Sequence, residues 1–75
     1  KKRYTLEHQG FEWTIDVFDG DNQGLVLAEI ELPSEETEFP LPTWAYREVT
    51  FDHRFANSAL SKLPWPHFSE EFTRE

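Results

Sequence analysis

Two stretches of alternating apolar and polar side chains constrain the fold more than any other feature of this sequence. From Phe11 to Val17 every second residue is apolar, and residues 25–32 repeat the alternation. A period of two is typical of β-strands in a sheet with one dry face. Residues 19–24, between the two stretches, are dense in Gly, Asp and Asn, which favour turns. These stretches predict two antiparallel strands joined by a polar loop.

A third strand is predicted over residues 3–8, and Gln9-Gly10 is predicted to form the two-residue turn that joins it to residues 11–18. With residues 25–32, these strands make a three-stranded antiparallel meander. If His8 pairs with Phe11 across this turn, the register of the first two strands follows, and if Phe18 similarly pairs with Leu25, that of the third strand follows. The predicted pairs are His8 with Phe11, Leu6 with Trp13, Tyr4 with Ile15, Glu7 with Glu12, Thr5 with Thr14, Arg3 with Asp16, Phe18 with Leu25, Thr14 with Glu29 and Glu12 with Glu31.

This register gives the sheet two unlike faces. The dry face is predicted to carry Tyr4, Leu6, Trp13, Ile15, Val17, Val26, Ala28, Ile30 and Leu32. The opposite surface, called the acidic face below, is predicted to carry Arg3, Glu7, Glu12, Asp16, Glu29 and Glu31. Carboxylates are poor strand formers, so their number on one face requires a reason. Trp13 lies on the central strand opposite Leu6 and is expected to be mostly buried.

The second half of the chain is predicted to form short helices. Ser34 followed by acidic residues predicts a helix over residues 34–39, which the prolines after it must end. Asp52 is predicted to cap a second helix over residues 52–63. The aromatic side chains of this half are expected to lie on the dry face of the sheet.

The predicted fold class is α+β, with one domain over residues 1–64 and a C-terminal tail over residues 65–75.

The chain contains no Cys, which excludes disulfides and Cys metal sites and is compatible with a cytoplasmic location. A net charge of −8 argues against nucleic acid or an anionic membrane as partner. No apolar stretch approaches membrane-spanning length. The chain begins at Lys1 and has no Met, which leaves open that it is a fragment of a longer protein.

The acidic face contains one arrangement that suits a metal ion. Glu29 and Glu31 are two residues apart on one strand, which places their carboxylates on the same side and roughly 7 Å apart. Mg²⁺ and Mn²⁺ bind one or two carboxylates and fill their remaining positions with water and phosphate. The alternative is a solvated outer face, because natural sheets often carry charge on the outside.

A small basic cluster precedes these acids. Lys1 and Arg3 alternate onto the acidic face, where an arginine can hold a phosphate through two hydrogen bonds. The alternatives are a frayed, solvated N-terminus or a cross-strand pair between Arg3 and Asp16. No nucleophile motif, phosphate-binding Gly-rich loop or dinucleotide fingerprint is present, so no catalytic residue is assigned.

Several blocks of the sequence resemble a known family when they are taken together. The blocks are residues 13–18 and 24–35, then Trp44, residues 47–50 and residues 54–60, preceded by the basic residues 1–4. In this order they resemble the C-terminal half of a bacterial CYTH domain, the triphosphate tunnel metalloenzyme fold. The similarity covers residues 1 to about 64.

The resemblance implies a fold and a site. The family is an eight-stranded antiparallel barrel with a polar tunnel, in which basic side chains hold a triphosphate and acidic ones hold divalent metal. Members hydrolyse tripolyphosphate or nucleotide triphosphates, phosphorylate thiamin derivatives or cyclise ATP. By this resemblance the metal-side residues are Glu29, Glu31 and Asp16, and the phosphate-binding residues are Lys1 and Arg3.

Two departures from the family limit what this chain is expected to do. The N-terminal Glu-x-Glu-x-Lys strand and the basic strands after it are absent, and Thr14 stands where an acidic residue is often found. Half a metal site and two cations should not catalyse phosphoryl transfer well. We therefore predict a half-length CYTH-like module that binds Mg²⁺ or Mn²⁺ and a polyphosphate or nucleotide triphosphate, and is weakly or not catalytic alone. The alternatives are a working triphosphatase or nucleotide cyclase completed by a second copy, and a non-catalytic protein-interaction module.

The open edges of the sheet predict an oligomer. A three-stranded sheet has two edges, and exposed edges pair with other chains unless they are blocked. A closed barrel has no edges. We therefore predict that the chain forms half of a CYTH-type barrel and that a second copy completes it around a two-fold axis.

Overall fold

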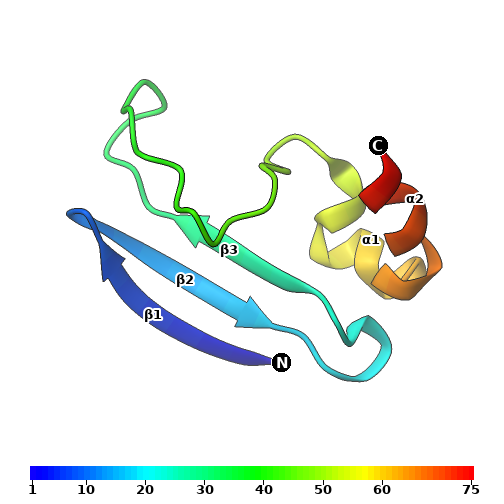
Figure 1. Ribbon diagram of the computed structural model, residues 1–75. Helices are drawn as coiled ribbons and strands as arrows, with labels where there is room; N and C mark the ends of the chain where they lie inside the picture. Colours follow the sequence, from blue (N-terminus) through cyan, green and yellow to red (C-terminus); the bar gives the residue numbers. More distant parts are fainter.

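The chain folds into a small sheet followed by short helices, as a computed structural model describing residues 1–75 shows. The strands are β1 (Lys2–His8), β2 (Phe11–Val17) and β3 (Val26–Ile30). They form one three-stranded antiparallel sheet in the order β1-β2-β3, with β2 in the centre (Figure 1). The predicted α+β fold and the meander are confirmed. Completion of a barrel by a second copy stays a prediction.

The turn between β1 and β2 sets the predicted register. Every predicted pair between these two strands is observed. Gln9 and Gly10 both have positive φ, at 51° and 84°. Positive φ at both central positions is the pattern of a type I′ hairpin turn, whose twist matches that of the flanking strands. Glycine adopts this conformation freely, whereas a residue such as glutamine adopts it less readily.

β3 is shorter than the strand predicted over residues 25–32, but it pairs with β2 in the predicted register. Just outside β3, the amide of Phe18 donates to the carbonyl of Leu25 at 3.0 Å. At the other end, the amide of Glu31 donates to the carbonyl of Glu12 at 3.3 Å. The two outermost predicted pairs are therefore in contact, although the backbone there is no longer a regular strand.

The second half of the chain contains helices of one or two turns. They are the 3₁₀ turns η1 (Gly20–Asn22), η2 (His53–Phe55) and η3 (Trp65–His67) and the α-helices α1 (Asn57–Lys62) and α2 (Ser69–Arg74). The Asp52 cap is confirmed, because its carboxylate accepts a hydrogen bond from the amide of Arg54 at 3.1 Å. The helix predicted over residues 52–63 is split in two because Ala56 is extended, with φ −66° and ψ 144°. None of the helices is long and apolar enough to cross a membrane.

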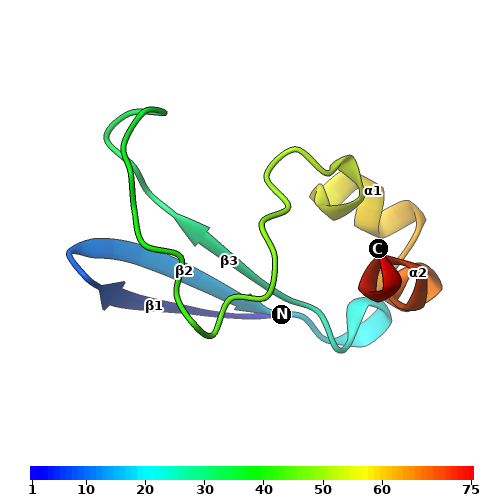
Figure 2. The same cartoon turned by 45° about the horizontal axis from the view of Figure 1, so that its top comes forward.

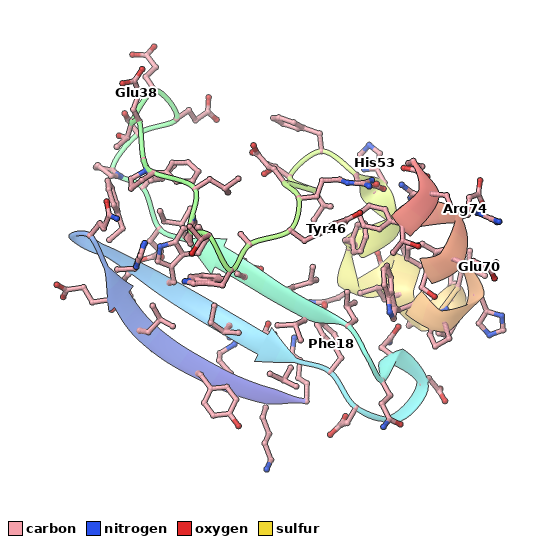
Figure 3. The ribbon with its side chains drawn as sticks, in the orientation of Figure 1. Phe18, Glu38, Tyr46, His53, Glu70 and Arg74 are labelled. Atoms are coloured by element: carbon pink, nitrogen blue, oxygen red, sulfur yellow. The ribbon has the colours of Figure 1, made fainter.

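The prediction of a helix over residues 34–39 is wrong, because this stretch forms a single turn in the loop between β3 and η2. The amide of Thr37 donates to the carbonyl of Ser34 at 3.2 Å, and no further turn follows. Pro40 follows too closely for a helix to continue, since proline lacks an amide hydrogen and disfavours helical geometry at the residue before it. Figure 3 shows Glu38 at the end of this loop that is remote from the helices.

The same loop, rather than the helices, covers the dry face around Trp13. Trp13 is 4% exposed, as predicted. The rings of Phe39 and Trp44 meet its indole edge to face, with centroids 6.0 and 5.4 Å away. Figure 2 shows this loop passing across the sheet. Elsewhere the dry face is open, and Tyr4 and Val26 remain 53% and 56% exposed.

The main apolar core lies among the helices, beside the end of the sheet at which β3 begins (Figure 1). Its buried members are Leu25, Phe55, Leu60, Phe68 and Phe72. Phe18 and Leu27 pack against it. Leu27 pairs with Asp16, so it belongs to the acidic face and not to the dry face. The expectation that the C-terminal aromatic residues lie on the dry face is therefore wrong for this core, because Leu25 and Leu27 offer apolar surface on the other side.

A polar contact and a close approach hold the helices to the loop after β2. The side-chain oxygen of Asn22 accepts a hydrogen bond from the amide of Trp65 at 2.8 Å. Gly24 lies beside the same indole, and its φ of +97° favours glycine. Figure 3 shows Phe18 in this region, between the end of β2 and the helices. The helical core is therefore anchored to the sheet through residues 18–27.

We expect Phe72→Ala to destabilise the fold far more than Phe51→Ala. Phe72 is 5% exposed, and its ring centroid lies 5.1 Å from that of Phe55 and 5.7 Å from that of Trp65. Removing a buried phenylalanine costs about 3–5 kcal/mol. Phe51 is 90% exposed, so the same change there should alter the free energy of unfolding by less than about 0.5 kcal/mol. Urea unfolding followed by circular dichroism measures both, and equal midpoints for the two variants would contradict this core.

Candidate functional site

The acidic face consists of three rows of side chains that run across the strands. The mixed row is Arg3, Asp16 and Leu27, the middle row is Thr5, Thr14 and Glu29, and the carboxylate row is Glu7, Glu12 and Glu31, the last lying just beyond β3. Directly opposite side chains on one face are about 4.5–5.5 Å apart at Cβ. The charge therefore changes along the strands, from an end with cations to an end with carboxylates alone.

The structure brings Asp16 together with both predicted phosphate-binding cations. Arg3 donates from Nε and Nη2 to the two carboxylate oxygens of Asp16, at 2.7 and 2.9 Å. Lys1 donates from Nζ to Oδ2 of the same carboxylate at 3.2 Å. The Asp16 side chain is 7% exposed, whereas those of Arg3 and Lys1 are 59% and 32% exposed. The cross-strand pair between Arg3 and Asp16, an alternative left open by the sequence, is therefore present.

These contacts keep the mixed row charged. The hydrogen bond from Arg3 is the largest effect that lowers the pKa of Asp16, which falls to about 2 with help from Lys1 and against the effect of burial. The same hydrogen bond raises the pKa of Arg3, and the charge of Glu29 adds a smaller increase. An opposite charge nearby favours the ionised form of each partner. Asp16 is therefore an anion at neutral pH, and Glu29 acts electrostatically on the mixed row.

Asp16 is buried because the helical core reaches this end of the sheet. Its neighbour Leu27 packs against that core, as does Phe18. Lys1 Nζ lies 4.9 Å from the centre of the Phe18 ring, so the cation is held between an aromatic face and a carboxylate. Phe18 and Leu27 are not among the site residues predicted from the sequence. The available signal was Leu25 and Leu27, two apolar residues at positions where the alternation otherwise places carboxylates.

Glu29 and Glu31 lie apart from the Asp16 contacts. Both side chains are exposed, and together with Ile30, Leu32 and Pro33 they line a shallow surface at the end of β3. No group of three or more His, Asp or Glu side chains lies close enough together to hold a metal ion. Two exposed carboxylates still fit a cation that keeps several water and phosphate ligands. Of the predicted metal-side residues, Asp16 has both oxygens engaged by cations, and the metal role of all three stays a prediction.

Comparison with known proteins supports the family suggested by the sequence blocks. The chain is 51% identical over 70 residues to an inorganic triphosphatase of Acetivibrio thermocellus. These residues are 93% of this chain but 45% of that protein, so the chain spans about half the length of this relative. No protein-family model matches the chain, and no solved structure matches it.

Acid should remove the stabilisation that Asp16 provides. Its pKa is about 2 in the folded chain against an ordinary value of 3.8, so the stabilisation is complete above about pH 4 and is lost as the pH falls toward 2. Asp16→Asn should lower the free energy of unfolding at pH 7 by at most about 2 kcal/mol, and by less where water screens the exposed Arg3. Urea unfolding at pH 7, 4 and 2 measures the difference from wild type.

The matched control is Asp21→Asn, which removes the same charge at an exposed position of η1. It should differ little from wild type at any of these pH values. A difference between Asp16→Asn and wild type that stays constant from pH 7 to pH 2 would contradict the role of the Asp16 contacts.

Proposed function

Because this chain belongs to the CYTH, or triphosphate tunnel metalloenzyme, family, we propose that it is a half-length module whose acidic face binds a divalent cation and a triphosphate-type anion. One observation carries the proposal. Arg3 and Lys1, held by Asp16, lie at one end of the same sheet face on which Glu29 lies. Cationic and carboxylate groups on one face are the two kinds of group that a metal-bound triphosphate needs. A bacterial origin and a cytoplasmic location stay predictions.

Arg3 and Lys1 supply the anion-binding groups in this proposal. Arg3 uses Nε and one Nη for Asp16, and more than half of its side chain remains exposed to a ligand. A guanidinium already held in place loses less conformational freedom when phosphate oxygens bind to it. In this arrangement Asp16 is a positioning residue, and a role as a metal ligand requires the two cations to release it.

Glu29 and Glu31 supply the cation-binding groups. Two carboxylates on one strand suit Mg²⁺ or Mn²⁺, whose other positions take water and phosphate oxygens. A divalent ion supplies charge neutralisation at the phosphoryl oxygens when it is bound. Glu29 lies in the middle row beside Thr5 and Thr14, between the mixed row with Arg3 and the carboxylate row with Glu31. A linear triphosphate lying along the strands therefore meets cationic side chains at one end and the carboxylates at the other.

We propose that one copy turns the anion over weakly or not at all. Phosphoryl transfer depends on many preorganised charges around the reacting group, and the acidic face offers two cations. β1 and β3 are both open edges at which a second copy can pair and supply further charges. In that assembly the module is a triphosphatase or a nucleotide cyclase. The proposal of a second copy is supported by the open edges, and the enzyme class by the triphosphatase relative.

Calorimetric titration with MnCl₂ tests cation binding. We expect binding heat for wild type and an affinity lower by about tenfold or more for Glu29→Gln/Glu31→Gln, since the loss of even an indirect partner of a metal ligand costs that much. The control Glu35→Gln/Glu36→Gln removes the same charge in the exposed turn after β3 and should bind as wild type does. Absence of heat from all three chains would leave a non-catalytic protein-interaction module as the function.

Phosphate release from tripolyphosphate, followed with malachite green in Mg²⁺ or Mn²⁺, tests catalysis. We expect a low rate per chain that rises with protein concentration, because a second copy must complete the site. Arg3→Gln should reduce the rate at every concentration, since it removes an anion-binding group. A high rate per chain that is independent of concentration would contradict the proposal that one copy is a weak catalyst.

A further inference from the structure

β1 is an edge strand whose outer side has no partner (Figure 1). Every residue from Lys2 to Glu7 is exposed. The strand contains neither proline nor glycine, and it pairs with β2 residue by residue without a bulge. Proline, bulges, covering loops and edge charges are the usual means by which proteins stop an edge from pairing with another chain, and of these β1 has only the charges of Lys2, Arg3 and Glu7. β1 therefore has the properties of a strand that accepts a further strand.

The backbone groups that β1 offers at this edge can be identified from the neighbouring strands. In an antiparallel sheet the amide and carbonyl of one residue point the same way, and the direction alternates along the strand. Glu12 accepts from the amide of Glu31, so the even-numbered residues of β2 face β3. The odd-numbered residues of β2 therefore face β1, where they pair with its even-numbered residues. The amides and carbonyls of Arg3, Thr5 and Glu7 consequently point outward.

We infer that β1 pairs antiparallel with β1 of a second copy, with Thr5 on the two-fold axis. The inference rests on the proposed two-copy assembly and specifies its interface. Thr5 is the midpoint of Lys2–His8, so this register pairs the strand along its whole length. Thr5 then pairs with Thr5 of the second copy, and Arg3 pairs with Glu7 of the second copy, twice by symmetry. All the outward amides and carbonyls at these three positions obtain partners.

Charge on the acidic face favours this register. Within one copy Glu7 lies opposite Glu12, and like charges directly opposite each other destabilise a sheet. The register places Arg3 of the second copy on the free side of Glu7, which offsets this repulsion. Arg3 is available for this contact because 59% of its side chain is exposed while it holds Asp16. The carboxylate row of one copy thereby continues into the mixed row of the other.

The dry face agrees with the same register. Tyr4 and Leu6 are 53% and 38% exposed in one copy. Centred on Thr5, the pairing places Tyr4 opposite Leu6 of the second copy, so each covers the other. Registers centred on Tyr4 or on Leu6 do not place Arg3 opposite Glu7. The charged and the apolar contacts therefore select the register centred on Thr5.

A single cysteine tests the register, since the chain has no cysteine of its own. In the inferred pairing, Thr5→Cys lies opposite itself at a Cα separation of about 5.5 Å, which a disulfide can bridge. We expect mild oxidation of the native chain to give a disulfide-linked dimer. Thr14→Cys is the matched control, because Thr14 is the partner of Thr5 on β2 and lies on the same face. Its two copies are three strand spacings apart, about 14 Å, and should remain unlinked.

A charge reversal tests the contacts. Glu7→Arg places two arginines opposite each other at both symmetry-related pairs, and should weaken dimerisation by about tenfold or more. Glu36→Arg makes the same change of net charge in the exposed turn after β3 and should dimerise as wild type does. Analytical ultracentrifugation across a concentration series measures both, and circular dichroism verifies that each variant is folded.

The outcomes separate this inference from the proposed function. Linkage of Thr5→Cys but not Thr14→Cys, with weaker dimers of Glu7→Arg alone, supports it. A wild-type dimer that Glu7→Arg does not weaken, or equal linkage of both cysteine variants, overturns the β1 interface and leaves the two-copy assembly to another edge. A wild type that stays monomeric at all concentrations overturns both the interface and the assembly. The MnCl₂ titration then still decides whether the acidic face binds a cation.

Discussion

The two-residue turn at Gln9-Gly10 is the constraint on which the other features of the structure depend. Because side chains alternate with a period of two, a slip of one residue would move every side chain of β1 to the opposite face of the sheet. Arg3 would then leave Asp16, and the two faces would lose their separation into apolar and charged. Positive φ at both turn positions closes the loop in the one register that keeps this separation.

The sheet could be predicted from the sequence because its determinants are local, whereas the helical core could not. Alternation and a turn motif are sufficient to place β1, β2 and their register. The core instead joins Leu25 to Phe68 and Phe72, which are far apart in the sequence and show no shared period. Residues 65–75, predicted as a tail, thus supply two of its buried side chains. No helix forms over residues 34–39, although Ser34 followed by acidic residues is typical of a helix N-terminus. The prolines after this stretch leave no room for a second turn.

The candidate site could be predicted as a set of residues but not as a set of contacts. The register alone places Arg3 opposite Asp16, and both a metal ion and an arginine are suitable partners for a carboxylate. Which partner Asp16 takes depends on its burial, which Leu27 and the helical core provide. That burial raises the cost of an unpaired charge, so the two cations are held close. Glu29 and Glu31 lie beyond the reach of this core and stay exposed, as the alternation alone indicates.

The proposed association and the proposed cation binding are coupled through the negative charge of the chain. Two copies with a net charge of −8 each repel one another, and a divalent cation bound to each reduces that charge to −6 (−8 plus 2). Along the carboxylate row, Arg3 of a second copy acts at the Glu7 end and the cation at the Glu31 end. Glu7 and Glu31 are two strand spacings apart, about 10 Å, which is near the screening length at ordinary ionic strength. The arginine of the second copy and the cation therefore repel each other little. Cation binding then favours association through the reduced net charge. Linkage requires association to strengthen cation binding by the same factor, most strongly at low salt.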